Sequence, residues 1–322
     1  LEREMHALYG LPLGEESGKA QSLIVLGMGK LGGYELNVSS DIDLIFCYAE
    51  DGETQAQEAG QRSLSNHEFF SRLGKKLIAA IAEVSEHGFC FRVDMALRPN
   101  GNSGPLVASL AMVEEYFLVQ GREWERYAWV KARAITGQAE DIAALEKIVF
   151  PFVYRRYLDF GAIDSLRAMH SQIRAEVIRQ EHKYPERSHN VKLGRGGIRE
   201  VEFHAQIHQL IHGGRNPALR APATRVALAA LAQAGMIDAA VAAQLDAAYV
   251  LLRTVEHRLQ MVDDLQTHEL PRDAAALDNV AALHGLPDGA ALLASLQPHV
   301  GHVAAAYDRL AGDEDADAET AA

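Results

Sequence analysis

The stretch LIVLGMGKLGGYELNVSSDIDLIF, at residues 23–46, decides the fold of this 322-residue chain. It begins with a short apolar run over 23–26, which is typical of a buried strand, and continues through the glycine-rich turn GMGKLGG. A second strand is expected over 42–48, where an alternating start leads into an apolar end. Only residues 34–40 separate the turn from the acidic residues, which is enough for about one helical turn.

The turn also matches the dinucleotide-binding fingerprint GxGxxG, which follows a strand and opens a helix. That fingerprint requires a parallel second strand, and the right-handed crossover to it needs about a dozen residues or more. Residues 34–40 are too few for a crossover helix. The acidic residues also stand at the start of the second strand, whereas a ribose-binding acid belongs at its end. A dinucleotide site is therefore disfavoured.

The acidic pair Asp41 and Asp43 suggests phosphoryl-transfer chemistry. Side chains alternate along a strand, so these two point the same way, about 7 Å apart. Their carboxylates can converge on two divalent cations about 4 Å apart, the geometry used for in-line phosphoryl displacement. Two carboxylates on one face repel unless a cation or a proton lies between them. The alternative for such a pair alone is two solvated aspartates at a strand edge.

A third acid strengthens the catalytic interpretation. A further strand is expected over 89–97, and alternation places Arg92, Asp94 and Arg98 on one face of it. An acid flanked by two arginines suits a metal ligand beside phosphate-binding cations. The predicted catalytic residues and metal ligands are Asp41, Asp43 and Asp94.

The glycine-rich turn is expected to bind phosphate. Glycines allow close approach of the backbone and leave its N–H groups as donors, and nearby lysine and serine side chains can add further donors. The predicted phosphate- and nucleotide-binding residues of this segment are Gly27, Gly29, Lys30, Gly32, Gly33, Ser39 and Ser40.

Composition excludes several classes of protein. The apolar fraction of 48% and charged fraction of 23% are those of a soluble globular protein, and no run of about eighteen apolar residues predicts a membrane span. A net charge of −13 argues against a nucleic-acid partner, which would need a basic surface. The only two cysteines, Cys47 and Cys90, are expected to be buried and reduced, which fits a cytoplasmic location.

Helical periodicity dominates the rest of the chain, so we expect an α+β fold: a small α/β unit followed by a helical bundle. Proline breaks are expected at Pro271, Pro287 and Pro298. The expected helices span 66–86, 112–133, 142–169, 198–212 and much of 224–310.

The expected boundaries follow from the same patterns. The chain opens inside a helix, as if cut from a longer protein, and its acidic end lacks apolar anchors. The expected parts are 1–20 as an upstream helix end and linker, 21–135 as the α/β domain, 136–311 as the helical domain, and 312–322 as a disordered tail or linker.

Several motifs together resemble the bacterial glutamine synthetase adenylyltransferase/adenylyl-removing enzymes. They are residues 23–46, VDMALRPNGNSGPL at 93–106, QGREWERYAWVKAR at 120–133, FPFVYRRYLDF at 150–160 and VKLGRGGIREVEF at 191–203. The form ELNVSSDIDLIF looks like the amino-terminal, adenylyl-removing half of that family. The resemblance implies a nucleotidyltransferase fold like that of DNA polymerase β, and it implies that the adenylylating half is missing here.

The resemblance further implies phosphorolysis of adenylyl-tyrosine on glutamine synthetase, with ADP as product and Mg²⁺ or Mn²⁺ as cofactor. Arg98, or Lys131 and Arg133, would receive the attacking phosphate, and Glu200 would form part of the site wall. Two alternatives stay open: adenylylation from ATP by the same kind of site, and a catalytically silent module that binds the PII regulatory protein. For Glu200 the alternative is an acid that complements a helix dipole.

Three histidines, His204, His208 and His212, recur every fourth residue on the expected helix over 198–212. An HxxxH pair on a helix can bind zinc, but no matching general-base glutamate follows His204. We therefore expect partly exposed histidines on one helix face.

Overall fold

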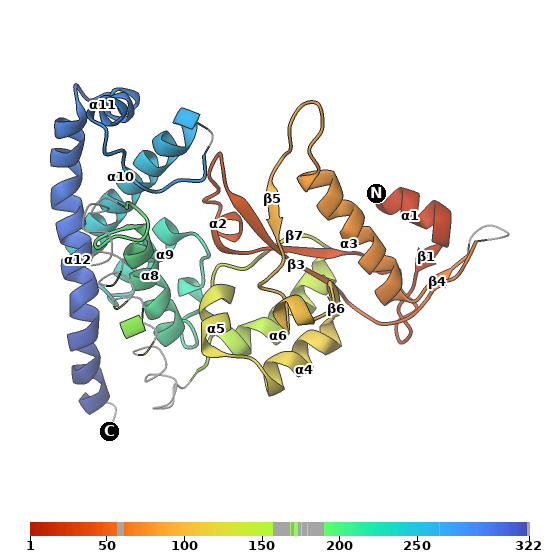
Figure 1. Cartoon of the computed structure of the whole chain (residues 1–322). Coiled ribbons are helices and arrows are strands. Elements are labelled where there is room, and N and C mark those ends of the chain that lie inside the picture. The colour runs from red at the N-terminus through yellow and green to blue at the C-terminus, as the bar shows by residue number, and fades with distance from the viewer. Residues whose placement is uncertain are drawn as a thin grey trace. The chain divides into compact units, whose positions relative to one another are not determined.

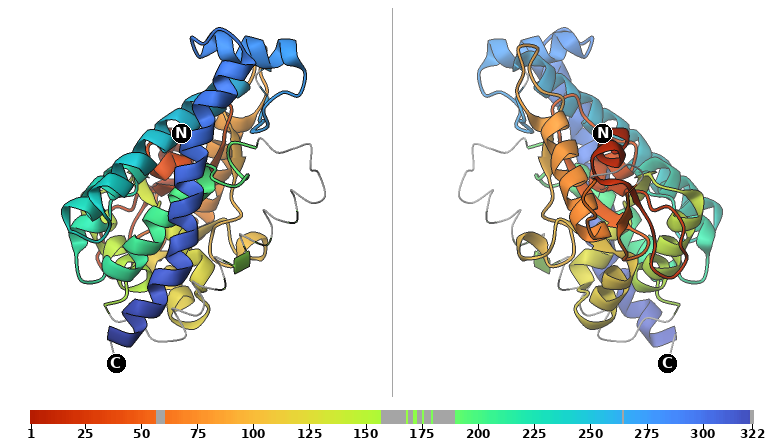
Figure 2. Two further views of the ribbon diagram at one scale, coloured as in Figure 1. Left: turned by 90° about the vertical axis from the view of Figure 1, so that its left-hand side faces the viewer. Right: turned by 90° about the vertical axis from the view of Figure 1, so that its right-hand side faces the viewer.

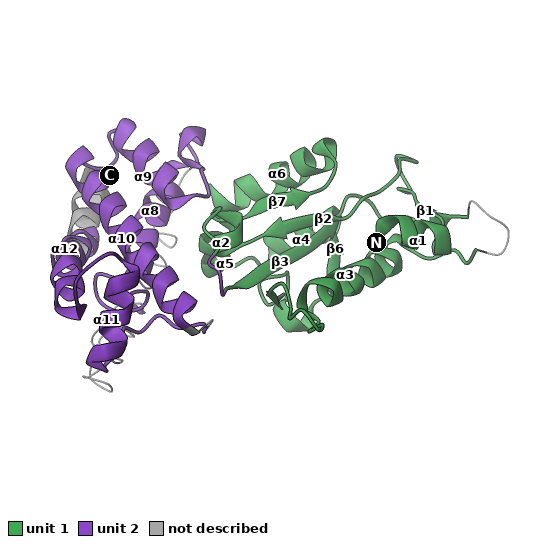
Figure 3. Cartoon of the chain, turned by 90° about the horizontal axis from the view of Figure 1, so that it is seen from above, with its two compact units in different colours: residues 1–36, 40–155 green, residues 37–39, 156–322 purple. Residues whose placement is uncertain are grey.

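The computed structural model describes residues 1–56, 61–156, 190–263 and 265–320, with isolated positions at 168, 171, 172, 175 and 179 (Figure 1). The chain divides into two units, coloured separately in Figure 3. Unit 1 comprises residues 1–36 and 40–155, and unit 2 comprises residues 37–39 and 156–322. Within the described residues, no helix combines the length and apolarity that a bilayer crossing demands.

Unit 1 is built on a mixed five-stranded sheet, as the sequence predicted. The strand order is β5-β3-β2-β7, and β6 also pairs with β3. The strands β2 and β3 are antiparallel, as are β2 and β7, whereas β5 and β6 both run parallel to β3. The antiparallel β2–β3 pair confirms that GMGKLGG does not open a dinucleotide-binding crossover. The strands are β2 (Ile24–Gly27), β3 (Asp41–Tyr48), β5 (Arg92–Asp94), β6 (Val107–Ser109) and β7 (Arg133–Thr136).

One face of this sheet is covered by the helix α3 (Asn66–Ala82). The helix begins after Ser65, whose side chain accepts a hydrogen bond from the Glu68 amide. Alternate β3 residues pack against its apolar stripe, as period-2 alternation predicts. This core contains Ile42, Leu44, Phe46 and Tyr48 of β3 and Phe69, Phe70 and Leu73 of α3.

Unit 1 also contains the helices α4 (Leu110–Val119), α5 (Glu123–Trp129) and α6 (Ala139–Val153). The rings of Phe117 on α4 and Phe152 on α6 stack with centroids 4.1 Å apart. Arg126 is fully buried and donates hydrogen bonds to the carbonyl oxygens of Phe152 and Val153, which fixes the end of α6. α6 therefore belongs to unit 1, although the sequence placed a domain boundary after residue 135.

The amino-terminal helix α1 (Glu2–Tyr9) packs against α3, with the His6 ring stacked on Phe69 at 5.8 Å (Figure 2). The two-residue strands β1 (Leu11–Pro12) and β4 (Thr54–Gln55) pair antiparallel beside it.

Unit 2 is helical in the parts that the structure describes. The long helix α12 packs along α10 and α8, as Figure 2 shows, and the buried residues of these helices form one apolar core. The helices are α8 (Ile198–His212), α9 (Thr224–Gln233), α10 (Ala239–Asp263), α11 (Ala274–Leu283) and α12 (Gly289–Thr320). The expected helix over 198–212 is thus confirmed at both ends.

Four details differ from the expectations. The single helix expected over 112–133 is two helices, and Arg133 already lies in β7. Pro298 lies inside α12 instead of breaking a helix. Cys90 is exposed, whereas Cys47 is buried as expected and burial raises the pKa of its thiol to about 12. The backbone of α12 continues to Thr320, where composition predicted a disordered tail.

Two expectations fall partly outside the described residues. The helix expected over 142–169 is present as α6 up to Val153, but residues 157–167 are not described. The last two residues of the acidic tail, 321 and 322, are likewise outside the described part.

Candidate active site

The three predicted acids lie on neighbouring strands in adjacent register. In the parallel pair β3–β5, Asp41 is opposite Arg92 and Asp43 is opposite Asp94. Residues directly opposite each other in a sheet share a face, and neighbouring strands lie about 4.8 Å apart. Asp94 is therefore within a side chain's reach of Asp43, and all three carboxylates belong to one face at the amino-terminal end of β3.

Asp41 and Asp94 each accept a hydrogen bond from another group of the chain. Arg92 donates from Nε to Asp41 Oδ1 at 2.6 Å, and both side chains are about two-fifths exposed. Asp94 Oδ1 accepts a hydrogen bond of 2.7 Å from the amide of Ala96, which fixes the turn after β5. The Asp41–Arg92 pair neutralises part of the like-charge repulsion that the acidic pair creates.

The glycine-rich turn passes directly beside Asp43. The Met28 amide donates to the carbonyl oxygen of Asp43 at 2.9 Å, and a Cβ atom on Gly29 would lie 3.5 Å from Asp43 Oδ2. Gly29 has a φ of +53°, in the left-handed region that favours glycine. The turn then forms the one-turn helix α2 (Gly29–Gly32).

Two of the amides predicted to bind phosphate are used inside this turn. The Gly32 amide donates to Met28 O at 3.1 Å, and the Gly33 amide donates to Gly29 O at 3.0 Å. These glycines therefore serve the turn's own hydrogen bonding in this structure. A Cβ on Gly32 would also lie 1.7 Å from the carbonyl oxygen of Lys131, so only glycine fits there.

Lys131 and Arg133, predicted to receive phosphate, contact the protein itself. Lys131 Nζ donates to Glu35 Oε2 at 2.7 Å, and both side chains are nearly buried, at 6% and 11% exposure. Arg133 donates to the carbonyl oxygens of Leu31 and Gly32, at 2.9 and 3.0 Å. Cations suit the carbonyl end of a helix, so Arg133 holds the end of α2 against β7, and Lys131 anchors Glu35 just beyond that end.

Tyr34 follows α2 in a left-handed conformation, with a φ of +59°. The guanidinium of Arg133 lies over its ring, 3.8 Å from the centroid. This cation–π contact helps to offset the cost of the unfavourable backbone conformation. Arg133 was predicted from the sequence, whereas Tyr34 and Glu35 were not, because their only sequence signal is their place directly after the glycines.

The remaining predicted residues are each placed individually. Arg98 donates from Nη1 to the carbonyl oxygen of Met95 at 2.7 Å, within the turn that follows β5. Lys30 lies within α2 and is partly exposed, while Ser39 and Ser40 are buried just before β3.

Glu200 belongs to unit 2, where it is buried in the first turn of α8. Its Oε2 accepts a hydrogen bond of 2.9 Å from the Gly196 amide. An acid in a first helical turn interacts favourably with the helix dipole. This contact matches the structural alternative for Glu200, and its predicted place in the site wall stays a prediction.

Three carboxylates on one face are the hard oxygen donors that Mg²⁺ and Mn²⁺ prefer, so the donor set fits a divalent cation. Across the described ranges, however, no three His, Cys, Asp or Glu side chains lie close enough together to hold a metal ion. Asp41 would have to exchange Arg92 for a cation to complete such a site. The three carboxylates are suitable ligands for a divalent cation, but in the side-chain conformations of this structure they do not converge on one point.

The chain was compared with known proteins. Residues 1–148 match the family model described as glutamate-ammonia ligase adenylyltransferase, and residues 167–311 match the one described as GlnD PII-uridylyltransferase. Among curated relatives, proteins of Ralstonia nicotianae and Aromatoleum aromaticum are each 52% identical over 97% and 98% of this chain. One from Chromobacterium violaceum is 54% identical over 89% of it. All three are named bifunctional glutamine synthetase adenylyltransferase/adenylyl-removing enzyme.

The chain spans about a third of the length of these relatives, with 34%, 32% and 31% of each covered. The family models describe its two parts differently, and the division at 148 and 167 agrees with the two units of the fold. Along nearly its whole length, the chain is thus a region of the glutamine synthetase adenylyltransferase/adenylyl-removing enzyme family.

Proposed function

We propose that this chain removes AMP from an adenylylated tyrosine of glutamine synthetase by phosphorolysis. The observation that carries the proposal is the register of Asp43 opposite Asp94, with Gly29 beside Asp43. This combination offers carboxylates for cations next to a backbone that a phosphate can approach. The direction of transfer rests on ELNVSSDIDLIF, which resembles the adenylyl-removing half of the family.

The reaction is a direct displacement. An oxygen of inorganic phosphate attacks the phosphorus of the AMP group, the bond from that phosphorus to the tyrosine oxygen breaks, and ADP forms. The tyrosine oxygen leaves as tyrosinate and takes up a proton. No covalent intermediate with the chain is needed, because positioning and charge neutralisation supply most of the catalysis in phosphoryl transfer.

In this proposal Asp41, Asp43 and Asp94 hold Mg²⁺ or Mn²⁺. A bound cation would supply charge neutralisation at the phosphoryl and leaving-group oxygens. If Asp41 exchanged Arg92 for a cation, the Arg92 guanidinium would be released and could bind phosphate in the bidentate manner typical of arginine. Arg98, in the turn that follows β5, is the second candidate to bind the incoming phosphate.

Lys131 and Arg133 act as positioning residues in this scheme, since their contacts are with Glu35 and the carbonyl end of α2. They keep Gly29 beside Asp43 instead of binding phosphate themselves. A loss of either would loosen the turn and so weaken catalysis indirectly.

Two other functions remain candidates on specific observations. The relatives are named as bifunctional, so the same site could instead attach AMP from ATP. The match of residues 167–311 to a PII-uridylyltransferase model favours a PII-binding role for unit 2, either alongside catalysis or without it.

The test incubates the chain with adenylylated glutamine synthetase, phosphate and Mg²⁺ or Mn²⁺, and measures ADP. A parallel reaction with ATP and unmodified glutamine synthetase tests the opposite direction. Asp43→Asn should abolish ADP release, because it removes a proposed metal ligand, while the far-ultraviolet circular dichroism spectrum stays that of the wild type. Asp246→Asn, which breaks an exposed ion pair with Arg225, is the matched control and should keep full activity.

The outcomes separate the candidates. AMP incorporation from ATP without ADP release would reverse the assigned direction. Absence of both reactions, together with binding of PII protein, would favour the silent module. Full turnover by the Asp43→Asn variant would remove the proposed role of the acidic site.

A further inference from the structure

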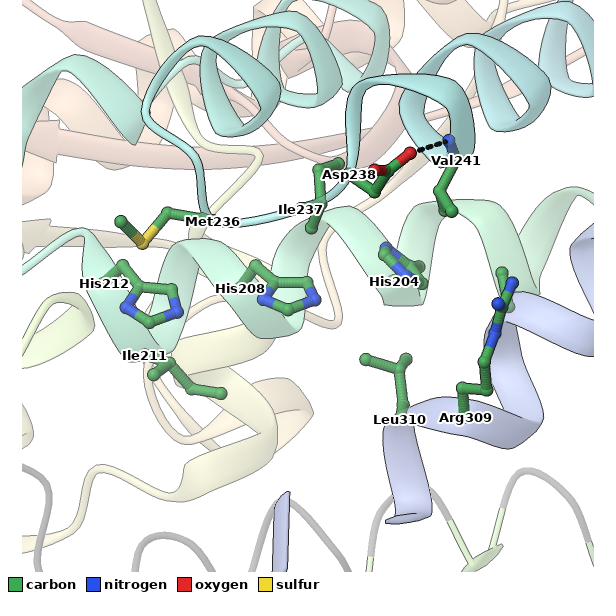
Figure 4. Close-up of a pocket in the computed structure, with 11 residues that line it drawn as sticks. His204, His208, Ile211, His212, Met236, Ile237, Asp238, Val241, Arg309 and Leu310 are labelled. Atoms are coloured by element: carbon green, nitrogen blue, oxygen red, sulfur yellow. Dashed lines mark hydrogen bonds between the residues drawn. The ribbon is translucent and has the colours of Figure 1, made fainter. Parts of the chain in front are cut away.

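The three histidines of α8 line a cavity inside unit 2. Their rings follow one another along the helix, with centroids 5.0 Å apart for His204 and His208 and 5.9 Å apart for His208 and His212 (Figure 4). The cavity has a volume of about 260 Å³. His204 is only 5% exposed, so the expectation of partly exposed histidines is wrong for this residue.

Two of these rings carry buried nitrogen atoms without a partner. His204 Nδ1 and His208 Nδ1 have no hydrogen bond within the part of the chain that the structure describes. Burial and the charge of Arg309 lower the pKa of His204 to about 4, and burial with the neighbouring imidazoles lowers that of His208 to about 3. Both rings are therefore neutral near pH 7, and each offers one N–H donor and one acceptor. Buried polar atoms left unsatisfied are costly, so a ligand that completes them is favoured.

Two charged residues line the cavity, Asp238 and Arg309. Arg309 of α12 lines it at the His204 end of the row of histidines, as Figure 4 shows; it is exposed and makes no hydrogen bond or ion pair with any described residue. Asp238 also lines the cavity, but its Oδ1 accepts hydrogen bonds from the amides of Ala240 and Val241, at 2.7 and 3.2 Å. The amino-terminal end of α10 stabilises the charge of that carboxylate, which makes no ion pair with Arg309 among the described residues.

The rest of the wall is apolar. It includes Ile211, Met236, Ile237 and Leu310. A cavity with one guanidinium, unsatisfied imidazoles and an aliphatic wall matches a ligand that has one anionic end and one apolar end.

We propose that unit 2 binds a small aliphatic carboxylate in this cavity. Its carboxylate meets the Arg309 guanidinium and the N–H groups of His204 and His208, and its chain lies against the aliphatic wall. Arginine binds carboxylates through two parallel charge-assisted hydrogen bonds. A metal ion is disfavoured at the same place, because no three His, Cys, Asp or Glu side chains of the described residues lie close enough together to hold one.

The test titrates the full chain with butyrate and follows the histidine ring signals by proton–carbon NMR. Butyramide has nearly the same shape without the charge, and zinc chloride tests a metal site. Butyrate should shift the ring signals of His204 and His208 saturably and bind roughly tenfold or more tightly than butyramide, since a hydrogen bond to a charged group is worth about 1.5–3 kcal/mol.

Variants then locate the charge. Arg309→Met should weaken butyrate binding roughly tenfold. Arg225→Met, at an exposed arginine paired with Asp246, should leave it unchanged. If Arg309→Met fails to fold, the comparison of butyrate with butyramide on the wild-type chain still shows whether binding requires the carboxylate charge. Equal binding of the two compounds, or zinc binding that shifts these rings where butyrate does not, would overturn the proposal.

Discussion

Acidification should destabilise unit 2 through His204 and His208. Both have pKa values lowered in the folded chain, to about 4 and about 3, from the ordinary value of 6.5. Below pH 6.5 these two histidines bind protons in the unfolded chain but stay neutral in the folded chain. The free energy of unfolding therefore falls as the pH drops from 6.5, and the fall ends only near the folded pKa values.

The size of the effect follows from linkage. Each histidine that is protonated only in the unfolded state changes the free energy of unfolding by up to about 1.4 kcal/mol per pH unit. Between about pH 7 and about pH 5, one such histidine costs about 2 kcal/mol, so the two together cost about 4 kcal/mol. That is a large part of the stability of an ordinary domain, about 5–15 kcal/mol.

The assay is urea unfolding followed by far-ultraviolet circular dichroism at the two pH values and constant ionic strength. His208→Leu should lose roughly half of the pH effect, because one titrating group is removed. Val241→Ala removes methyl groups from the same cavity and no titrating group, so it should show the wild-type pH effect at a lower overall stability. Other titrating groups are common to all three proteins and cancel in the comparison.

Two results would refute this reasoning. The first is a His208→Leu variant with the full wild-type pH effect. The second is an NMR titration of the folded chain in which both rings protonate near pH 6.5.

Two further predictions concern stability. Glu35→Gln leaves buried Lys131 without that carboxylate and should lower the free energy of unfolding by about 3 kcal/mol, and adding Lys131→Met should restore part of the loss, both measured by urea unfolding. A Cβ at Gly301, within α12, meets nothing within 4 Å, so Gly301→Ala should stabilise by about 0.5–1 kcal/mol. Gly74→Ala in α3 should instead lower the free energy of unfolding, because the added Cβ would lie 2.9 Å from the Phe46 ring. If both substitutions changed the free energy of unfolding equally, the packing argument would be wrong.

The local parts of the fold were predictable because their signals are local. The 3.6-residue spacing located α3 and α8, and alternation put Asp41 and Asp43 on one face. The chain length between the glycines and Asp41 ruled out a crossover helix, and the antiparallel β2–β3 pair agrees with that. Each of these inferences needed only a few consecutive residues.

The missed parts depend on partners far away in the sequence. The strand β7 has only four residues and pairs with β2, more than a hundred residues earlier. Its Arg133 and Ala134 are also good helix formers, so the helical pattern seemed to continue into it. The ion pair of Glu35 with Lys131 joins residues 96 apart, and their burial arises only when β7 docks beside α2. No property of either residue in isolation reveals it.

The contacts of Lys131 and Arg133 change how the candidate site should be understood. The sequence grouped all nearby cations as phosphate ligands, yet these two are committed to Glu35 and to the carbonyl end of α2. Arg92 differs because its partner, Asp41, is itself a proposed metal ligand, and their exposed ion pair costs little to break. One exchange would then both complete the cation site and release a guanidinium for phosphate. Arg92, more than Lys131 or Arg133, is therefore the cationic residue that we expect to change its partner when a ligand binds at the acidic face.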